Sequence, residues 1–117
     1  MNKFELFTIL HEFLNDYRKE NEVTESYNYY LYDSNPYVWK DCVSADPATY
    51  AEYEKWIGKK NITLENSYDI AKEYVYFLND DYYNLEEIRK AFDSISRDRW
   101  TDACKDYLSK PHKGDNL

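Results

Sequence analysis

The stretch NKFELFTILHEFLNDY, residues 2–17, predicts the first and clearest helix of the protein. Asn2 can cap a helix, and Glu5 follows three residues later, which is the spacing of a capping box. Large apolar residues then recur at three- and four-residue steps, as on one face of an α-helix. They are Phe4, Phe7, Leu10, Leu14 and Tyr17, with Leu6 and Phe13 widening the stripe. We therefore expect an amphipathic helix over residues 3 to 20.

Cap residues predict further helices downstream. Asp46 followed by Pro47 is a strong helix start, and Gly58 supplies a stop after Ile57. Thr63 can cap the next helix, which we expect to end near residues 79 to 81. Its apolar positions are Leu64, Tyr68, Ala71, Val75 and Leu78.

Two shorter helices are expected near the carboxyl end. Asn84 and Glu87 form another capping-box pair, and Ser96 can cap a last helix before Pro111. The apolar positions of the two helices are Leu85, Ile88, Phe92 and Ile95, then Trp100, Ala103, Cys104, Tyr107 and Leu108.

The segment SYNYYLYDSNPYVW, residues 26–39, is ambiguous because it contains five tyrosines and a tryptophan. Val23, Tyr27, Tyr30 and Leu31 fit a helix, whereas alternation of Tyr27, Tyr29 and Leu31 with their neighbours fits a strand, which tyrosine favours. Residues 33–36 (DSNP) predict a turn, with Pro36 suited to begin a helix. A short apolar helical face would then comprise Val38, Trp39, Cys42 and Val43.

These patterns predict a mostly α protein, a compact bundle of about five or six helices. A short β element within residues 26–33 is the alternative for the ambiguous segment. The chain of 117 residues fits one domain, which we place at residues 1–110, with a flexible tail at 111–117. Fourteen tyrosines predict an aromatic-rich core, because each can bury its ring while its hydroxyl stays hydrated or bonded.

The sequence lacks most of the motifs that are typical of catalytic sites. Two glycines leave no glycine-rich phosphate loop. His11 stands on a predicted helix, where we expect a surface or hydrogen-bonded histidine, and His112 stands in the predicted tail. We therefore expect a protein that is not an enzyme and that uses no cofactor.

The sequence also argues against a disulfide-bonded, a metal-binding or a membrane-spanning protein. Cys42 and Cys104 are isolated, which indicates free thiols in a reducing compartment and favours a cytoplasmic protein. Asp80 and Asp81 are adjacent but belong to no calcium-binding loop, so no metal site is expected. No apolar run is long enough to span a membrane.

Acidic residues dominate the chain and are segregated along it. The formal charge is −8, with −7 in residues 20–54, −6 in residues 61–87 and +3 in residues 88–113. Two rows of carboxylates recur at four-residue steps, as Glu65, Asp69 and Glu73 and as Asp98, Asp102 and Asp106. Successive carboxylates of such a row are about 6 Å apart along the helix. The row resembles the charges along a nucleic-acid strand, although ordinary solvated helix faces carry similar charges.

This composition resembles that of small inhibitors from bacteria, phages and mobile elements, a class that includes immunity proteins, antitoxins, and antirestriction or anti-CRISPR proteins. The leading hypothesis is an acidic, DNA-mimic-like inhibitor of a basic protein such as a nuclease, without direct binding of nucleic acid or membrane. Tyr29, Tyr32 and Tyr37 would anchor the partner. Glu65, Asp69, Glu73, Asp80 and Asp81 would supply charge. The alternative is an adaptor or structural domain that forms homodimers or larger homo-oligomers through its Tyr-rich face.

Overall fold

The computed structural model describes residues 1–78, 83 and 85–117, and within them the chain forms six helices and no strand. The mostly α prediction is therefore confirmed. The helices are α1 (Lys3–Glu20), α2 (Glu25–Asp33), α3 (Pro47–Ile57), α4 (Leu64–Phe77), α5 (Leu85–Asp93) and α6 (Arg97–Leu108).

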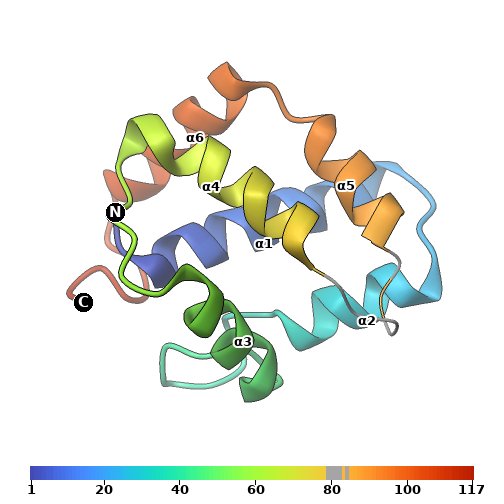
Figure 1. Ribbon diagram of the computed structural model, residues 1–117, viewed down its shortest axis with the longest axis horizontal. Helices are drawn as coiled ribbons and strands as arrows, with labels where there is room; N and C mark the ends of the chain where they lie inside the picture. Colours follow the sequence, from blue (N-terminus) through green and yellow to red (C-terminus); the bar gives the residue numbers. More distant parts are fainter. Residues whose placement is uncertain (79–82, 84) are drawn as a thin grey trace.

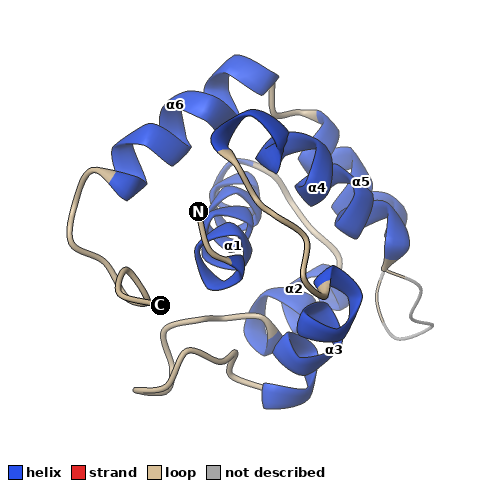
Figure 2. Ribbon diagram, turned by 60° about the vertical axis from the view of Figure 1, so that its left-hand side comes forward, coloured by secondary structure: helices blue, strands red, loops and turns tan. Residues whose placement is uncertain are grey.

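Helix α1 lies at the centre of the bundle, with α4, α5 and α6 along one side of it and α2 on another (Figures 1 and 2). Its capping box forms as expected: the Asn2 side chain accepts from the Glu5 amide at 2.8 Å, and the Glu5 carboxylate accepts from the Asn2 amide at 2.7 Å. Every residue from 4 to 11 is buried, together with Phe13 and Leu14. The expected amphipathic stripe is thus too narrow, because neighbouring helices surround the first half of α1.

Residues 26–33 of the tyrosine-rich segment are helical, so the expected β alternative within them is wrong. Thr24 caps α2 by accepting from the Tyr27 amide at 3.2 Å. Glu87 of α5 then accepts hydrogen bonds from the amide and hydroxyl groups of Thr24, which places a carboxylate at the amino end of α2. This contact between residues 63 positions apart overrides the strand preference of tyrosine.

Helical phase divides the tyrosines of α2 into two groups. Tyr27 and Tyr30 are 1% and 2% exposed, whereas Tyr29 and Tyr32 are 45% and 72% exposed. The Tyr27 hydroxyl donates to the Leu14 carbonyl of α1 at 2.8 Å, and so satisfies its buried polar end.

Residues 37–43 form turns and bends, so the expected short helix with a Val38, Trp39, Cys42 and Val43 face is wrong. Side chains, not helical hydrogen bonds, hold this segment. Asn35 accepts from the Tyr37 amide at 3.0 Å, and the Trp39 indole donates to the Ala45 carbonyl at 3.0 Å. We refer to residues 34–46 as the 34–46 loop.

The later helices begin where the caps predict. Asp46, Thr63 and Ser96 each accept a hydrogen bond from an amide in the first turn of α3, α4 and α6. Helix α3 ends before Gly58, whose φ of 55° lies in the left-handed region. Asn84 and the expected end of α4 at residues 79 to 81 lie outside the described residues.

Aromatic contacts join these helices in the core. Trp100 of α6 is fully buried, stacks on Phe13 of α1 with centroids 5.4 Å apart, and donates to the Ser67 hydroxyl at 2.9 Å. The Tyr53 hydroxyl of α3 donates to the Lys3 carbonyl at 2.6 Å. The core is therefore rich in aromatic rings whose polar atoms are bonded.

Replacing Tyr27 with Phe removes its hydroxyl and the bond to the Leu14 carbonyl. We expect the Tyr27→Phe variant to lose about 1 kcal/mol of unfolding free energy, because a buried hydrogen bond is lost. The matched Tyr32→Phe variant removes a hydroxyl from a mostly exposed side chain and should change stability by less than about 0.5 kcal/mol. Urea unfolding of both variants measures this, and equal losses would contradict the assigned burial.

Candidate functional site

Exposed aromatic and apolar side chains lie on α2 and on the 34–46 loop. They are Tyr29, Tyr32, Tyr37, Val38 and Trp39, and we call them the aromatic surface. Tyr37, Val38 and Trp39 are each about half exposed, at 51%, 50% and 51%. Three consecutive large side chains that are half exposed to solvent are unusual for a loop and are typical of a contact surface.

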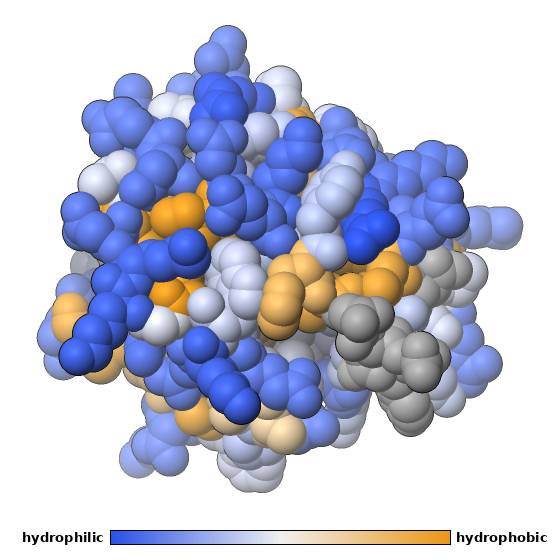
Figure 3. Space-filling model, viewed as in Figure 1, coloured by the Kyte–Doolittle hydropathy of each residue, from blue (hydrophilic) through white to orange (hydrophobic). Residues whose placement is uncertain are grey.

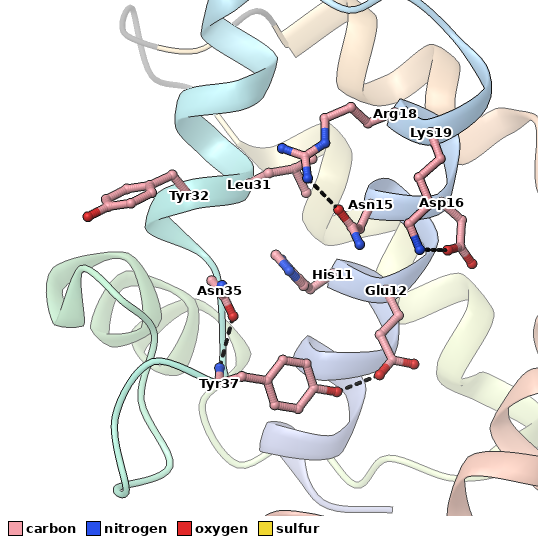
Figure 4. Close-up of a pocket in the computed structure, with 10 residues that line it drawn as sticks. All are labelled: His11, Glu12, Asn15, Asp16, Arg18, Lys19, Leu31, Tyr32, Asn35 and Tyr37. Carbon is pink, nitrogen blue, oxygen red and sulfur yellow. Dashed lines mark hydrogen bonds and ion pairs between the residues drawn. The ribbon is translucent and has the colours of Figure 1, made fainter.

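The three tyrosines predicted as anchors are thus all exposed, and two of them line one pocket. The pocket has a volume of about 550 Å³ and lies between α1, α2 and the start of the 34–46 loop. Figure 4 shows the Tyr37 ring reaching across it toward Glu12 of α1, while the Tyr32 ring points outward from α2. The Tyr37 hydroxyl donates to the Glu12 carboxylate, which fixes the ring at the pocket edge.

The far end of the pocket carries both signs of charge. Arg18 donates to the side-chain oxygens of Asn15 at 2.7 Å and Asn28 at 3.3 Å. Lys19 lies 3.4 Å from the Asp16 carboxylate, and both side chains are largely exposed. The cations of the pocket are therefore engaged with groups of this chain.

His11 faces the pocket from α1 and is only 8% exposed. Its Nδ1 lies 3.2 Å from the hydroxyl of Ser34, which is itself 2% exposed. Burial, and to a lesser extent the charge of Arg18, lowers the pKa of His11 to about 4. His11 is therefore a neutral, hydrogen-bonded helix histidine at ordinary pH, which is one of the two outcomes expected for it.

The predicted acid row of α4 is exposed, but an arginine interrupts it. Glu65, Asp69 and Glu73 all face solvent. Arg97 of α6 lies 2.7 Å from the Asp69 carboxylate, and hydrogen bonding to this arginine lowers the pKa of Asp69. The predicted Asp80 and Asp81 lie outside the described residues.

The acid row and the aromatic surface face different neighbours. Asp69 turns toward α6, whereas the Tyr29 hydroxyl donates to Glu25 of its own helix at 2.8 Å. Figures 1 and 2 place α6 and α2 on opposite sides of α1. The structure therefore does not bring Asp69 to the side of the molecule that carries Tyr32 and Tyr37.

Acids closer to the aromatic surface in sequence belong to residues 20–54, which hold eight acids and Lys40 as the sole base. Several of them are exposed: Glu20, Glu22, Glu25, Asp41, Asp46 and Glu52. Glu54 pairs with Lys3 at 2.6 Å, and Asp33 accepts from the Tyr83 hydroxyl at 2.6 Å. The most acidic third of the chain thus also carries the aromatic surface.

Sequence reasoning missed Val38 and Trp39 as surface residues. Residues 33–36 and residues 46–47 are turn and cap signals on either side of them, and could have indicated a loop between two helices. It also missed a second, more aromatic hollow of about 740 Å³, which is lined by Tyr30, Thr49, Glu52, Lys55, Trp56, Tyr74, Phe77, Leu78 and Tyr83.

On the face seen in Figure 3, hydrophilic residues cover most of the surface, and apolar residues appear in small separate areas. Among the described residues, no helix has the length and apolar character needed to cross a bilayer. The same residues contain no cluster of three His, Cys, Asp or Glu side chains able to hold a metal ion. Comparison with protein-family models, curated proteins and solved structures finds no match to this chain.

The depressed pKa of His11 predicts loss of stability in acid. The unfolded chain binds a proton near pH 6.5, whereas folded His11 does so only near pH 4, so stability falls as the pH drops through this window. We expect His11 to remove about 2 kcal/mol of unfolding free energy between about pH 7 and about pH 5.

Urea unfolding at both pH values, with and without His11→Gln, measures this contribution. Glutamine cannot titrate, so the variant should show a smaller fall in stability, and His112 contributes equally to both proteins. An identical pH dependence in the two proteins would rule out a buried neutral His11.

Proposed function

We propose that this protein is a small, acidic, non-catalytic binding protein that inhibits a basic, nucleic-acid-handling protein by docking its aromatic surface on it. The observation that carries the proposal is the exposure of Tyr32, Tyr37 and Trp39 within the most acidic third of the chain. Tyr and Trp anchor protein interfaces, and surrounding charges speed association with a partner of opposite sign.

The arrangement of the surface supports a protein partner over a nucleic acid. Proteins that stack bases pair aromatic rings with a basic groove, whereas the 34–46 loop carries Lys40 as its only base beside Asp41 and Asp46. The three arginines of the carboxyl-terminal quarter are engaged within the fold. Arg97 pairs with Asp69, Arg89 lies 4.9 Å from the Tyr76 ring, and Arg99 lies 5.6 Å from the Phe13 ring.

Two further observations support a non-catalytic and cytoplasmic protein. Ser34 and His11 are in contact, but both are buried and His11 resists protonation, so this pair is suited to packing. Cys42 and Cys104 are free thiols, and burial raises the pKa of Cys104 to about 11, which makes it unreactive.

Because Asp69 is paired with Arg97, we assign the contacts with a basic partner mainly to the acids around α2 and α3, and less to the acid row of α4. A carboxylate already paired with arginine offers less to a partner's cation. Glu65 and Glu73 remain exposed and would contribute to the overall field of the molecule.

The test begins with affinity capture from the source cell, followed by measurement of the dissociation constant for the purified partner. Trp39→Ala or Tyr32→Ala should weaken binding by about tenfold or more, since interface anchors contribute at least 1 to 2 kcal/mol. Tyr76→Ala, which removes a tyrosine of 43% exposure from α4, is the control and should bind as the wild type does.

Salt separates the acidic mode of docking from a purely apolar one. Affinity should fall steeply between about 50 mM and about 500 mM NaCl, because salt screens exposed charges. An affinity that salt leaves unchanged would refute the acidic inhibitor. If light scattering instead showed a tight homodimer that Trp39→Ala dissociates, the adaptor alternative would replace it.

A further inference from the structure

The segment that follows α6 folds back over the amino end of α1. The Asn2 side chain donates to the Gly114 carbonyl at 2.8 Å, and His112 Nε2 contacts the Glu5 carboxylate, with both side chains about nine-tenths buried. Gly114 has a φ of +82°, and a Cβ there would lie 2.6 Å from the Phe4 ring. This close, left-handed approach requires glycine.

Lys113 extends the same segment onto the 34–46 loop. Its ammonium group donates to the Pro36 carbonyl at 2.7 Å and also to the Trp39 carbonyl. The two acceptors flank Tyr37 and Val38, so one side chain braces the loop on both sides of its exposed residues. Because Lys113 and the loop are more than seventy residues apart, the brace is a purely tertiary feature.

The hydrogen bonds of His112 require its charged form. Nδ1 lies 2.7 Å from the Lys110 carbonyl, and Nε2 lies against the Glu5 carboxylate. Both partners accept hydrogen bonds only, so both ring nitrogens must donate, and only the imidazolium carries two N–H groups. A neutral ring would lose one of the two bonds.

Other charged and aromatic groups also surround His112. The Asp115 carboxylate accepts from the His112 amide at 3.0 Å, and the Tyr107 ring of α6 lies 4.3 Å away. The neighbouring cations are Lys110 and Lys113. Burial opposes the charge, but the bonds to the Lys110 carbonyl and to Glu5 outweigh it and raise the pKa of His112.

We propose that residues 110–115 form a protonation-dependent clasp that holds the 34–46 loop and thereby orients the exposed residues of that loop. Protonated His112 seats the clasp on Glu5, Gly114 packs on Phe4, and Lys113 then fixes the loop. Lys113 and His112 are positioning residues. The consequence for partner binding rests on the proposed function, whereas the clasp itself does not.

Hydrogen exchange of the intact protein tests the brace without any partner. Lys113→Ala removes two bonds from a charged donor, so amide exchange in residues 34–46 should rise by about tenfold or more. Lys59→Ala, which removes an exposed lysine from another loop, should leave that exchange unchanged. Unchanged exchange in α4 shows that the variant remains folded, and equal exchange of the loop in both variants would overturn the clasp.

The pH dependence tests the histidine. A pKa raised by folding means that the stabilisation is present in acid and is lost as the pH rises through the folded pKa. After correction for intrinsic exchange rates, protection of residues 34–46 should therefore fall between about pH 5.5 and about pH 8. His112→Gln, which cannot titrate, should remove this dependence. A wild-type loop whose protection does not vary with pH would overturn the role of protonation.

Partner binding distinguishes failure of the clasp from failure of the proposed function. If Lys113→Ala loosens the loop but the captured partner binds both Lys113→Ala and Trp39→Ala normally, the clasp stands and the docking surface is wrong. If Trp39→Ala abolishes binding while Lys113→Ala leaves loop exchange unchanged, the docking surface stands and the clasp is wrong.

Discussion

Buried and partly buried tyrosines bond their hydroxyl groups to backbone carbonyls of other segments, and these bonds organise the bundle. Leaving such a group unpaired in the core costs more than the bond contributes when made. Tyr27, Tyr53 and Tyr68 each avoid this cost by donating to a backbone carbonyl, at Leu14, Lys3 and Ile95. Each bond joins two separate segments of the chain.

These bonds explain how a chain with few aliphatic residues packs closely. Aromatic rings supply large buried areas, and edge-to-face contacts such as Phe7 with Tyr50, at 5.0 Å, add specific geometry. Helix α1 contributes many apolar side chains to the core, and buried tyrosines of α2, α3 and α4 pack around this helix. The hydroxyl bonds then allow only a few relative positions of these helices.

Tyrosine also forms part of the exposed surface, because the helical repeat of α2 turns some tyrosines toward the core and others toward solvent. On α2, residues 27 and 30 point inward, and residues 29 and 32 point outward. The exposed pair belongs to an acidic part of the chain, next to an irregular loop that side-chain hydrogen bonds and two backbone hydrogen bonds at its base hold in place. The proposed protein-recognition role rests on this arrangement and not on the exposed acid row of α4, where Arg97 engages Asp69.

By itself, the sequence determined the helical class and the caps of α1, α3, α4 and α6, and it suggested Tyr29, Tyr32 and Tyr37 as candidate anchors. Local signals suffice there, since a cap or an apolar period involves residues within a few positions of each other. Only the tertiary structure decided the rest. Glu87 reaches Thr24 to stabilise α2 as a helix, Lys113 holds the loop that exposes Trp39, and Arg97 neutralises Asp69. Each of these contacts joins residues at least 28 positions apart, and no local pattern can encode such a distance.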